Sequence, residues 1–327
     1  MRFAPTPCVI TRPTAELALV SAYSAVFVLG GALFWLSVER PGHSPDWSAW
    51  DFSWFQYLAM ALTLLWYCCG LARTESETRP SVWRRTVFLA GLAVIYAVLQ
   101  TRFDYMAQHM FFLNRVQHVV MHHLGPFLIA LGWPGATIRA GMPQWARRIA
   151  EDRRIATFVR IVQQPVLAAI LFVGLFYFWL IPPVHFRAML DARLYAVMNW
   201  SMVLDGILFW ALVLDPRPKP PARISFGARA ALSFAVMFPQ ICLGALITFS
   251  ARDLYPFYDL CGRLYPTISA IEDQHIGGIV IWIPPAMMSV VGVLVVLNAL
   301  RLVEEAETDE DREGSALSTL AARWTGR

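Results

Sequence analysis

Windows of about 20 mostly apolar residues recur along the chain, and a helix of that length crosses the hydrocarbon core of a bilayer. Only 15% of the residues are charged, against about 25% in soluble domains. A helix satisfies its own backbone hydrogen bonds in lipid, so we predict an all-α polytopic transmembrane helix bundle with about eight spans, or seven. The windows cover residues 15–37, 51–71, 84–103, 110–132, 158–181, 194–214, 228–249 and 276–300.

The charged residues lie mainly between these windows. Arginines gather in the loops that follow the second, fourth and sixth windows. Loops rich in Arg and Lys stay in the cytoplasm, so both termini are predicted to be cytoplasmic. The net charge of +4 is spread over these short loops, which argues against a nucleic-acid partner and for the lipid bilayer as the surroundings. We expect a multi-pass protein of a bacterial inner (plasma) membrane.

The composition changes near residue 304. Residues 1–303 are predicted to form the transmembrane helix-bundle domain. Residues 304–327 carry an acidic run and no sustained apolar face, so we predict an acidic, partly disordered cytoplasmic tail.

The segment 104–134 concentrates side chains that bind metals. It holds four of the seven histidines and three of the twelve methionines, within a predicted span. Ionisable groups at membrane depth are costly and by default indicate a functional site. Imidazole and thioether groups are also ligands that suit copper. The segment therefore predicts a copper site.

Helical spacing selects residues within this segment. Asn114, His118 and His122 follow at four-residue steps and are predicted to share one helical face. His123 is expected to point about 100° away from His122, so that both would not serve one site. A single histidine in a helix is more often a hydrogen-bonded structural residue, and this alternative stays open.

Later windows contain further polar residues. Asp205 lies mid-window and Asn199 near the start of the same window, while Asp273 and His275 precede the last one. Ionisable groups within a membrane face the bundle interior, so these side chains can converge with His109 at the predicted periplasmic end. Asp205 could equally form a hydrogen bond between helices.

These considerations give two sets of candidate residues. The predicted metal ligands are His118, His122, His109, Met110, Met121 and His275. The residues predicted to support them are Asn114, Asp205, Asp273 and Asn199. The chain has no phosphate-binding glycine loop, HExxH motif or nucleophile elbow, so no catalytic residue is predicted.

Three segments resemble the CtaG-type cytochrome c oxidase assembly factors. They are QHVVMHHLGPFLIALGWP at 117–134, GILFWALVLDPRP at 206–218 and EDQHIGGIVIWIPPAMM at 272–288. The resemblance covers roughly residues 50–300, and His118, Asp273 and Gly277-Gly278 match the motif positions. This chain has Asn114 and Asn199 at two positions where the family commonly has histidine, which suggests a divergent member. The resemblance implies a role in copper delivery to, or maturation of, the oxidase.

The leading hypothesis is a membrane assembly factor, not an enzyme. It would bind copper as Cu(I) near the periplasmic side and serve a cytochrome c oxidase subunit or another copper enzyme. The first alternative is a transporter or channel for copper or another small solute. The second is a haem-binding redox protein with His118 and His275 as axial ligands, although the leading hypothesis expects no haem.

Overall fold

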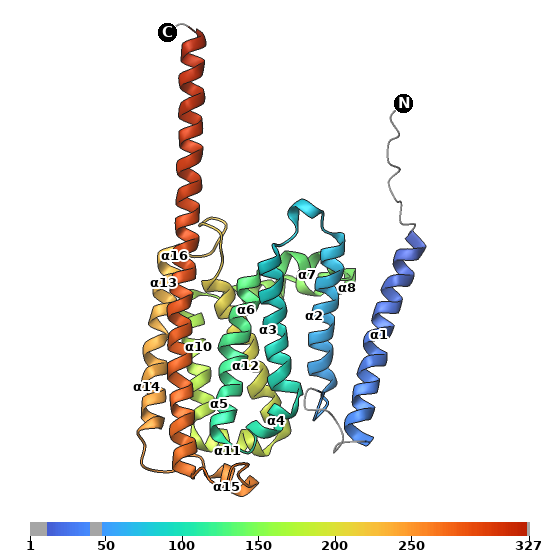
Figure 1. Ribbon diagram of the computed structural model, residues 1–327, viewed down its shortest axis with the longest axis vertical. Coiled ribbons are helices and arrows are strands. Elements are labelled where there is room, and N and C mark those ends of the chain that lie inside the picture. The colour runs from blue at the N-terminus through green and yellow to red at the C-terminus, as the bar shows by residue number, and fades with distance from the viewer. Residues whose placement is uncertain (1–11, 40–47, 326–327) are drawn as a thin grey trace.

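The computed structural model describes the backbone of residues 12–39 and 48–325 and the side chains of 19–39 and 48–308. Within these ranges the regular structure is entirely helical (Figure 1), which confirms the predicted all-α bundle. The first half contains α1 (Arg12–Glu39), α2 (Trp54–Arg73), η1 (Ser76–Thr78), α3 (Val82–Gln100), α4 (Arg102–Ala107), α5 (Phe111–Val119), η2 (Val120–Leu124), α6 (Gly125–Gly132), α7 (Gly135–Gly141) and α8 (Gln144–Ala150). The second half contains α9 (Arg153–Val162), α10 (Pro165–Leu180), α11 (Pro182–Leu190), α12 (Ala192–Val213), α13 (Phe226–Ala235), α14 (Met237–Thr248), α15 (Phe257–Cys261) and α16 (Ala270–Thr325).

Each predicted window coincides with helix, but fewer helices qualify as spans. Six helices among the described residues are long and apolar enough to cross a membrane, or seven if α9 and α10 together form one bent span. The segment 110–132 is helical as α5, η2 and α6 in succession, yet it is divided by η2 and carries several polar residues. The described part of the chain thus supports six or seven spans by length and hydropathy, and not eight.

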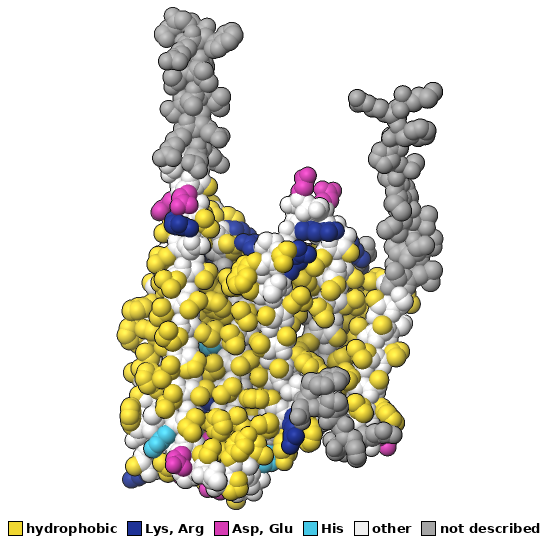
Figure 2. All heavy atoms as spheres, viewed as in Figure 1, with side chains coloured by type: hydrophobic (Ala, Val, Ile, Leu, Met, Phe, Trp, Pro, Cys, Tyr) yellow, Lys and Arg dark blue, Asp and Glu magenta, His cyan; other side chains and the backbone are white. Residues whose placement is uncertain are grey.

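The bundle has two chemically different ends. In Figure 1 the lower end carries α4, α11 and α15, and we call it the α15 end. The opposite end carries α7, α8 and the turn between α2 and α3, and we call it the α7 end. Figure 2 shows Arg and Lys side chains along the α7 end of a broad hydrophobic belt. The arginine-rich loops thus lie on one side, while their cytoplasmic location stays a prediction.

The long helix α16 leaves the bundle at the α7 end (Figure 1). It continues as helix to Thr325 and so includes most of the segment predicted as an acidic tail. The side chains beyond residue 308 lie outside those that the structure describes. The boundary near residue 304 therefore remains a prediction.

The run α5–η2–α6 is the central rod of the bundle. Its first part packs against α16 and its last part against α3. The neighbouring helices approach the rod closely because their glycines face it. A Cβ added at Gly91 of α3 would lie 2.9 Å from the Gly125 carbonyl oxygen. A Cβ added at Gly206 of α12 would clash with the His122 carbonyl oxygen. The rod is thus held by backbone contact on two sides, and its polar side chains are directed into the interior.

Candidate functional site

The central rod carries a line of buried polar side chains. They are at most 1% exposed to solvent, which is unusual for residues of these types. The set comprises Asn114, Arg115, Gln117, His118, His122 and His123. Buried polar groups need partners, so their contacts define what the interior can do.

His122 and His123 form one cluster with residues of three other helices. The Nε2 atom of His122 lies 3.0 Å from Oδ2 of Asp205 on α12. The Nδ1 atoms of the two histidines are 3.3 Å apart, and Nε2 of His123 lies 3.1 Å from the side-chain nitrogen of Gln240 on α14. Phe172 of α10 stacks on the His122 ring with centroids 4.2 Å apart.

The expectation that His123 turns away from His122 is wrong. Val120–Leu124 is a π-helical turn, in which the hydrogen bonds span five residues instead of four. Within this turn the two imidazole rings contact each other, with ring centroids 4.7 Å apart. His123 therefore belongs to the cluster.

The hydrogen bonds of the cluster fix a consistent set of tautomers. His122 donates from Nε2 to the Asp205 carboxylate, which leaves its Nδ1 as an acceptor. The Gln240 amide donates to Nε2 of His123, so His123 donates from Nδ1 to Nδ1 of His122. A chain of hydrogen bonds between four side chains thus joins α14, η2 and α12, while Oε1 of Gln240 has no hydrogen-bond partner among the described residues.

His118 lies one turn closer to the α15 end and is less well satisfied. Among the residues that the structure describes, its buried Nε2 atom has no hydrogen-bond partner. Asn199 of α12 lies beside it, and its two side-chain polar atoms are likewise without a well-formed hydrogen bond to any described residue. An unpaired buried polar group costs about 1–3 kcal/mol of stability. His118 and Asn199 are therefore costly polar groups at this position.

Arg115 is a buried cation that hydropathy did not single out. It donates to the Asn114 side chain, and its guanidinium lies 4.9 Å from the centroid of the Phe111 ring. Its Nε and Nη1 atoms have no hydrogen-bond partner in the described part of the chain. An arginine within a mostly apolar window was the signal that could have identified it.

Asp273 of α16 binds the backbone at the start of α5. Its two carboxylate oxygens accept hydrogen bonds from the backbone N–H groups of Phe111 (2.9 Å) and Phe112 (2.7 Å), which begin α5. Arg263 also donates to it over 2.6 Å. The carboxylate therefore links the start of α16 to the start of the rod, and it does not contact the histidines.

A second polar network lies at the α15 end. Asp104 of α4 accepts hydrogen bonds from Tyr195 (2.8 Å), Gln117 (2.5 Å) and Gln108 (3.1 Å). Burial raises the pKa of Asp104 to about 6, and the three hydrogen bonds oppose this rise only in part. The carboxyl group is thus poised to gain a proton in mildly acidic conditions.

This pKa predicts how stability depends on pH. The folded protein binds the Asp104 proton more tightly than an unfolded chain with the ordinary pKa of 3.8, so stability should rise as the pH falls through about 6. Asp104→Asn should remove this component. Melting temperatures of the two purified proteins between these pH values test it, and parallel pH profiles would contradict it.

The other predicted ligands are dispersed. His109 is half-buried, its ring lies 4.2 Å from the Tyr105 ring at a tilted angle, and its Nδ1–H donates to the Tyr105 carbonyl oxygen over 2.8 Å. His275 contacts the Ser250 carbonyl oxygen at 3.3 Å and not His118. Met110 and Met121 are buried in two separate apolar clusters. Among the described residues, no three His, Cys, Asp or Glu side chains are placed to share a metal ion.

Sequence comparison gives relatives for most of the chain. Uncharacterized proteins Mb0105 of Mycobacterium bovis and MT0111 of Mycobacterium tuberculosis are each 25% identical over 258 residues, which is 72% of this chain and 37% of theirs. Uncharacterized protein ML1998 of Mycobacterium leprae is 27% identical over 238 residues, which is 66% of this chain and 34% of its own. The chain thus spans little more than a third of these relatives.

No solved structure matches the chain significantly. The family model of the cytochrome c oxidase caa3 assembly factors matches residues 65–301. That range includes the central rod, the His122–Asp205 pair and the start of α16 up to Arg301. The chain therefore belongs to the cytochrome c oxidase caa3 assembly factor family.

Proposed function

We propose that the protein assists the maturation of a cytochrome c oxidase by holding copper, as Cu(I), at its buried histidines and passing it to an oxidase subunit or a related copper enzyme. The role is one of binding and handover without catalysis. The observation that carries the proposal is the pair of facing Nδ1 atoms of His122 and His123, 3.3 Å apart. Membership of the assembly-factor family supports the client class.

The cluster has the chemistry of a ligand pair. Metal–imidazole bonds are about 2.0–2.1 Å long, so nitrogens 3.3 Å apart can both reach one ion. Asp205 holds the opposite nitrogen of His122, which is the arrangement that orients a metal-binding imidazole and raises its basicity. Imidazole nitrogens suit copper among the transition metals.

Gln240 allows His123 to change tautomer, which frees both Nδ1 atoms for a metal without loss of a proton. In the structure the amide nitrogen donates to His123, which places a proton between the two Nδ1 atoms. If the amide turns over, its unpartnered Oε1 accepts from Nε2 of His123 instead. Both Nδ1 lone pairs are then free, as metal binding requires.

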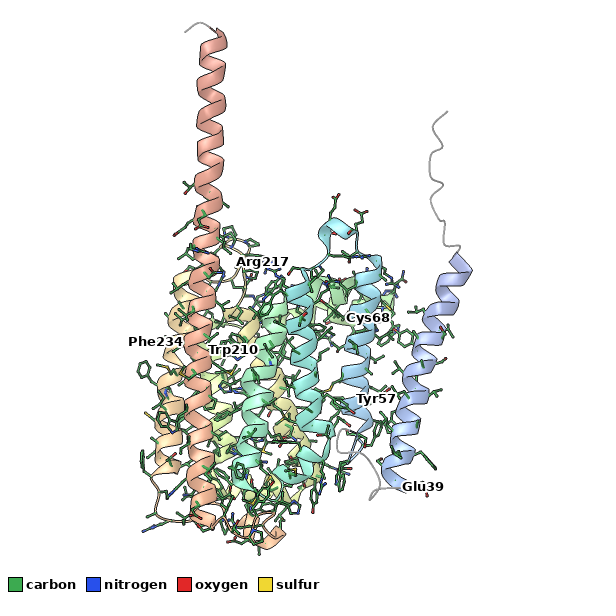
Figure 3. All side chains as sticks on the ribbon, in the orientation of Figure 1. Glu39, Tyr57, Cys68, Trp210, Arg217 and Phe234 are labelled. Carbon is green, nitrogen blue, oxygen red and sulfur yellow. The ribbon has the colours of Figure 1, made fainter. Side chains whose placement is uncertain are left out.

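The location of the polar line supports handover over transport. From the α15 end it runs through His118 to the His122–Asp205 pair. Toward the α7 end the interior is closed by an apolar cluster that includes Phe127, Phe209 and Trp210, the last of which is labelled in Figure 3. A copper ion could thus approach from one side, while the other side offers no ligand of comparable chemistry in this cluster.

A binding experiment tests the proposal. We expect the purified protein to bind Cu(I) in competition with a chromogenic chelator, and a His118→Ala/His122→Ala variant to lose this binding. His109→Ala is the matched control, because His109 binds the Tyr105 carbonyl oxygen and lies apart from the cluster. Unchanged copper affinity in the double variant, together with normal oxidase maturation in cells, would overturn the proposal.

A further inference from the structure

Helix α9 is sharply bent away from the apolar helix that follows it. The sequence predicted one straight span at 158–181, but α9 and α10 meet at an angle of 76°. The cause is local: Gln164 precedes Pro165 and adopts an extended conformation (ψ 129°), as a residue before proline prefers. The apolar helix α10 therefore begins at Pro165, and α9 lies at a steep angle to it.

The two faces of α9 differ in chemistry. Ile155, Phe158, Val159 and Val162 recur at helical spacing and form one apolar face. The opposite face carries two arginines and a threonine, Arg153, Thr157 and Arg160.

The protein leaves this apolar face uncovered. Ile155 is 41% exposed and Phe158 62% exposed, and α9 contains no buried residue. On α8, Trp145 and Ile149 are also more than half exposed. The segment thus presents large apolar side chains that the described part of the bundle covers only in part, such as Trp145 against the Trp66 ring at 6.2 Å.

The charge near α9 is positive. The segment from residue 139 to 160 contains two acidic residues, Glu151 and Asp152, and the latter caps α9 by accepting from the N–H of Arg154. It contains six arginines, at 139, 147, 148, 153, 154 and 160. Arg223 donates to the Arg160 carbonyl oxygen and so ties α9 to the loop after α12 at the α7 end.

We propose that α8 and α9 form a membrane-surface segment that binds the phosphate groups of anionic phospholipids. The bend at Gln164 lays α9 across the end of α10, so its apolar face can enter the acyl boundary while its arginines meet headgroup phosphates. Arginine suits this contact because its planar fork binds phosphate oxygens in pairs. The occupant is a lipid surface because the apolar and basic faces are presented together.

Hydrogen–deuterium exchange of the full chain in lipid nanodiscs tests this proposal. We expect the α9 amides to exchange several-fold more slowly in phosphatidylglycerol than in phosphatidylcholine. Arg153→Gln/Arg154→Gln/Arg160→Gln should remove the difference between the two lipids. Arg79→Gln/Arg84→Gln/Arg85→Gln is the matched control, with the same charge change at the same end, and should preserve it.

Two further measurements separate the contribution of the apolar face from that of the phosphate contact. Ile155→Ser/Phe158→Ser should speed exchange of α9 in both lipids, because the apolar face no longer enters the bilayer. Inorganic phosphate added to phosphatidylcholine nanodiscs should leave α9 exchange unchanged. Equal exchange in the two lipids, or protection by inorganic phosphate equal to that by phosphatidylglycerol, would overturn the proposal.

Discussion

Asp273→Ala should lower the free energy of unfolding by about 3–5 kcal/mol, the usual cost of removing one partner from a buried ion pair. The substitution leaves Arg263 without its fully buried partner. It also removes the acceptor for the first two N–H groups of α5, at Phe111 and Phe112. Thermal unfolding of the purified protein, followed by intrinsic fluorescence, measures the loss.

The control is Asp259→Ala. Asp259 binds the same arginine over 2.6 Å, but its side chain is 53% exposed. An exposed ion pair contributes about 0–1 kcal/mol, so this variant should melt close to the wild type. If the two variants lost equal stability, the structural importance assigned to Asp273 would be wrong.

Asp205→Asn should weaken copper binding by about 10- to 100-fold, the usual effect of losing a group that orients a metal-binding histidine. Asparagine keeps the size of the side chain and still offers an oxygen to His122. It lacks the negative charge that raises the basicity of the imidazole. This prediction rests on the proposed copper site, and chelator competition under reducing conditions measures it.

Asp191→Asn is a suitable comparison for this variant. Asp191 caps the start of α12 by accepting from the N–H groups of Arg193 and Leu194, so it lies on the same helix as Asp205 but outside the histidine cluster. Its variant should bind copper like the wild type. Equal losses in both variants would indicate a general effect on α12 and not an effect on the ligand pair.

Most of the fold follows from hydropathy because lipid leaves few alternatives to helix. All eight apolar windows coincide with helix, and the bend before α10 is encoded by Pro165, which the sequence shows. The π turn at Val120–Leu124 was not predictable in this way, because it changes hydrogen bonding without changing composition. Periodicity rules assume a regular helix and fail where one residue is added to a turn.

Only part of the candidate site could be predicted from the sequence. His122 and Asp205 were both selected for their cost in a membrane, and the structure pairs them across 83 positions. Gln240 was missed because a neutral amide costs less to bury in a membrane than a charged group. His123 was set aside because its side chain was expected to point away from His122. Met110 and Met121 lie in two apolar clusters, where methionine packs as readily as it binds metals, so their role as ligands stays a prediction.

The five-residue turn at Val120–Leu124 also changes the direction in which the packing surface of the central rod faces. Without this turn, the packing surfaces of α5 and α6 would lie on the same side of one helix. Both would then face the same neighbouring helix. With the turn, α5 presents its packing surface to α16 while α6 presents its own to α3. A single inserted residue thus lets one continuous helix join two separate halves of the bundle, with the paired histidines at the joint.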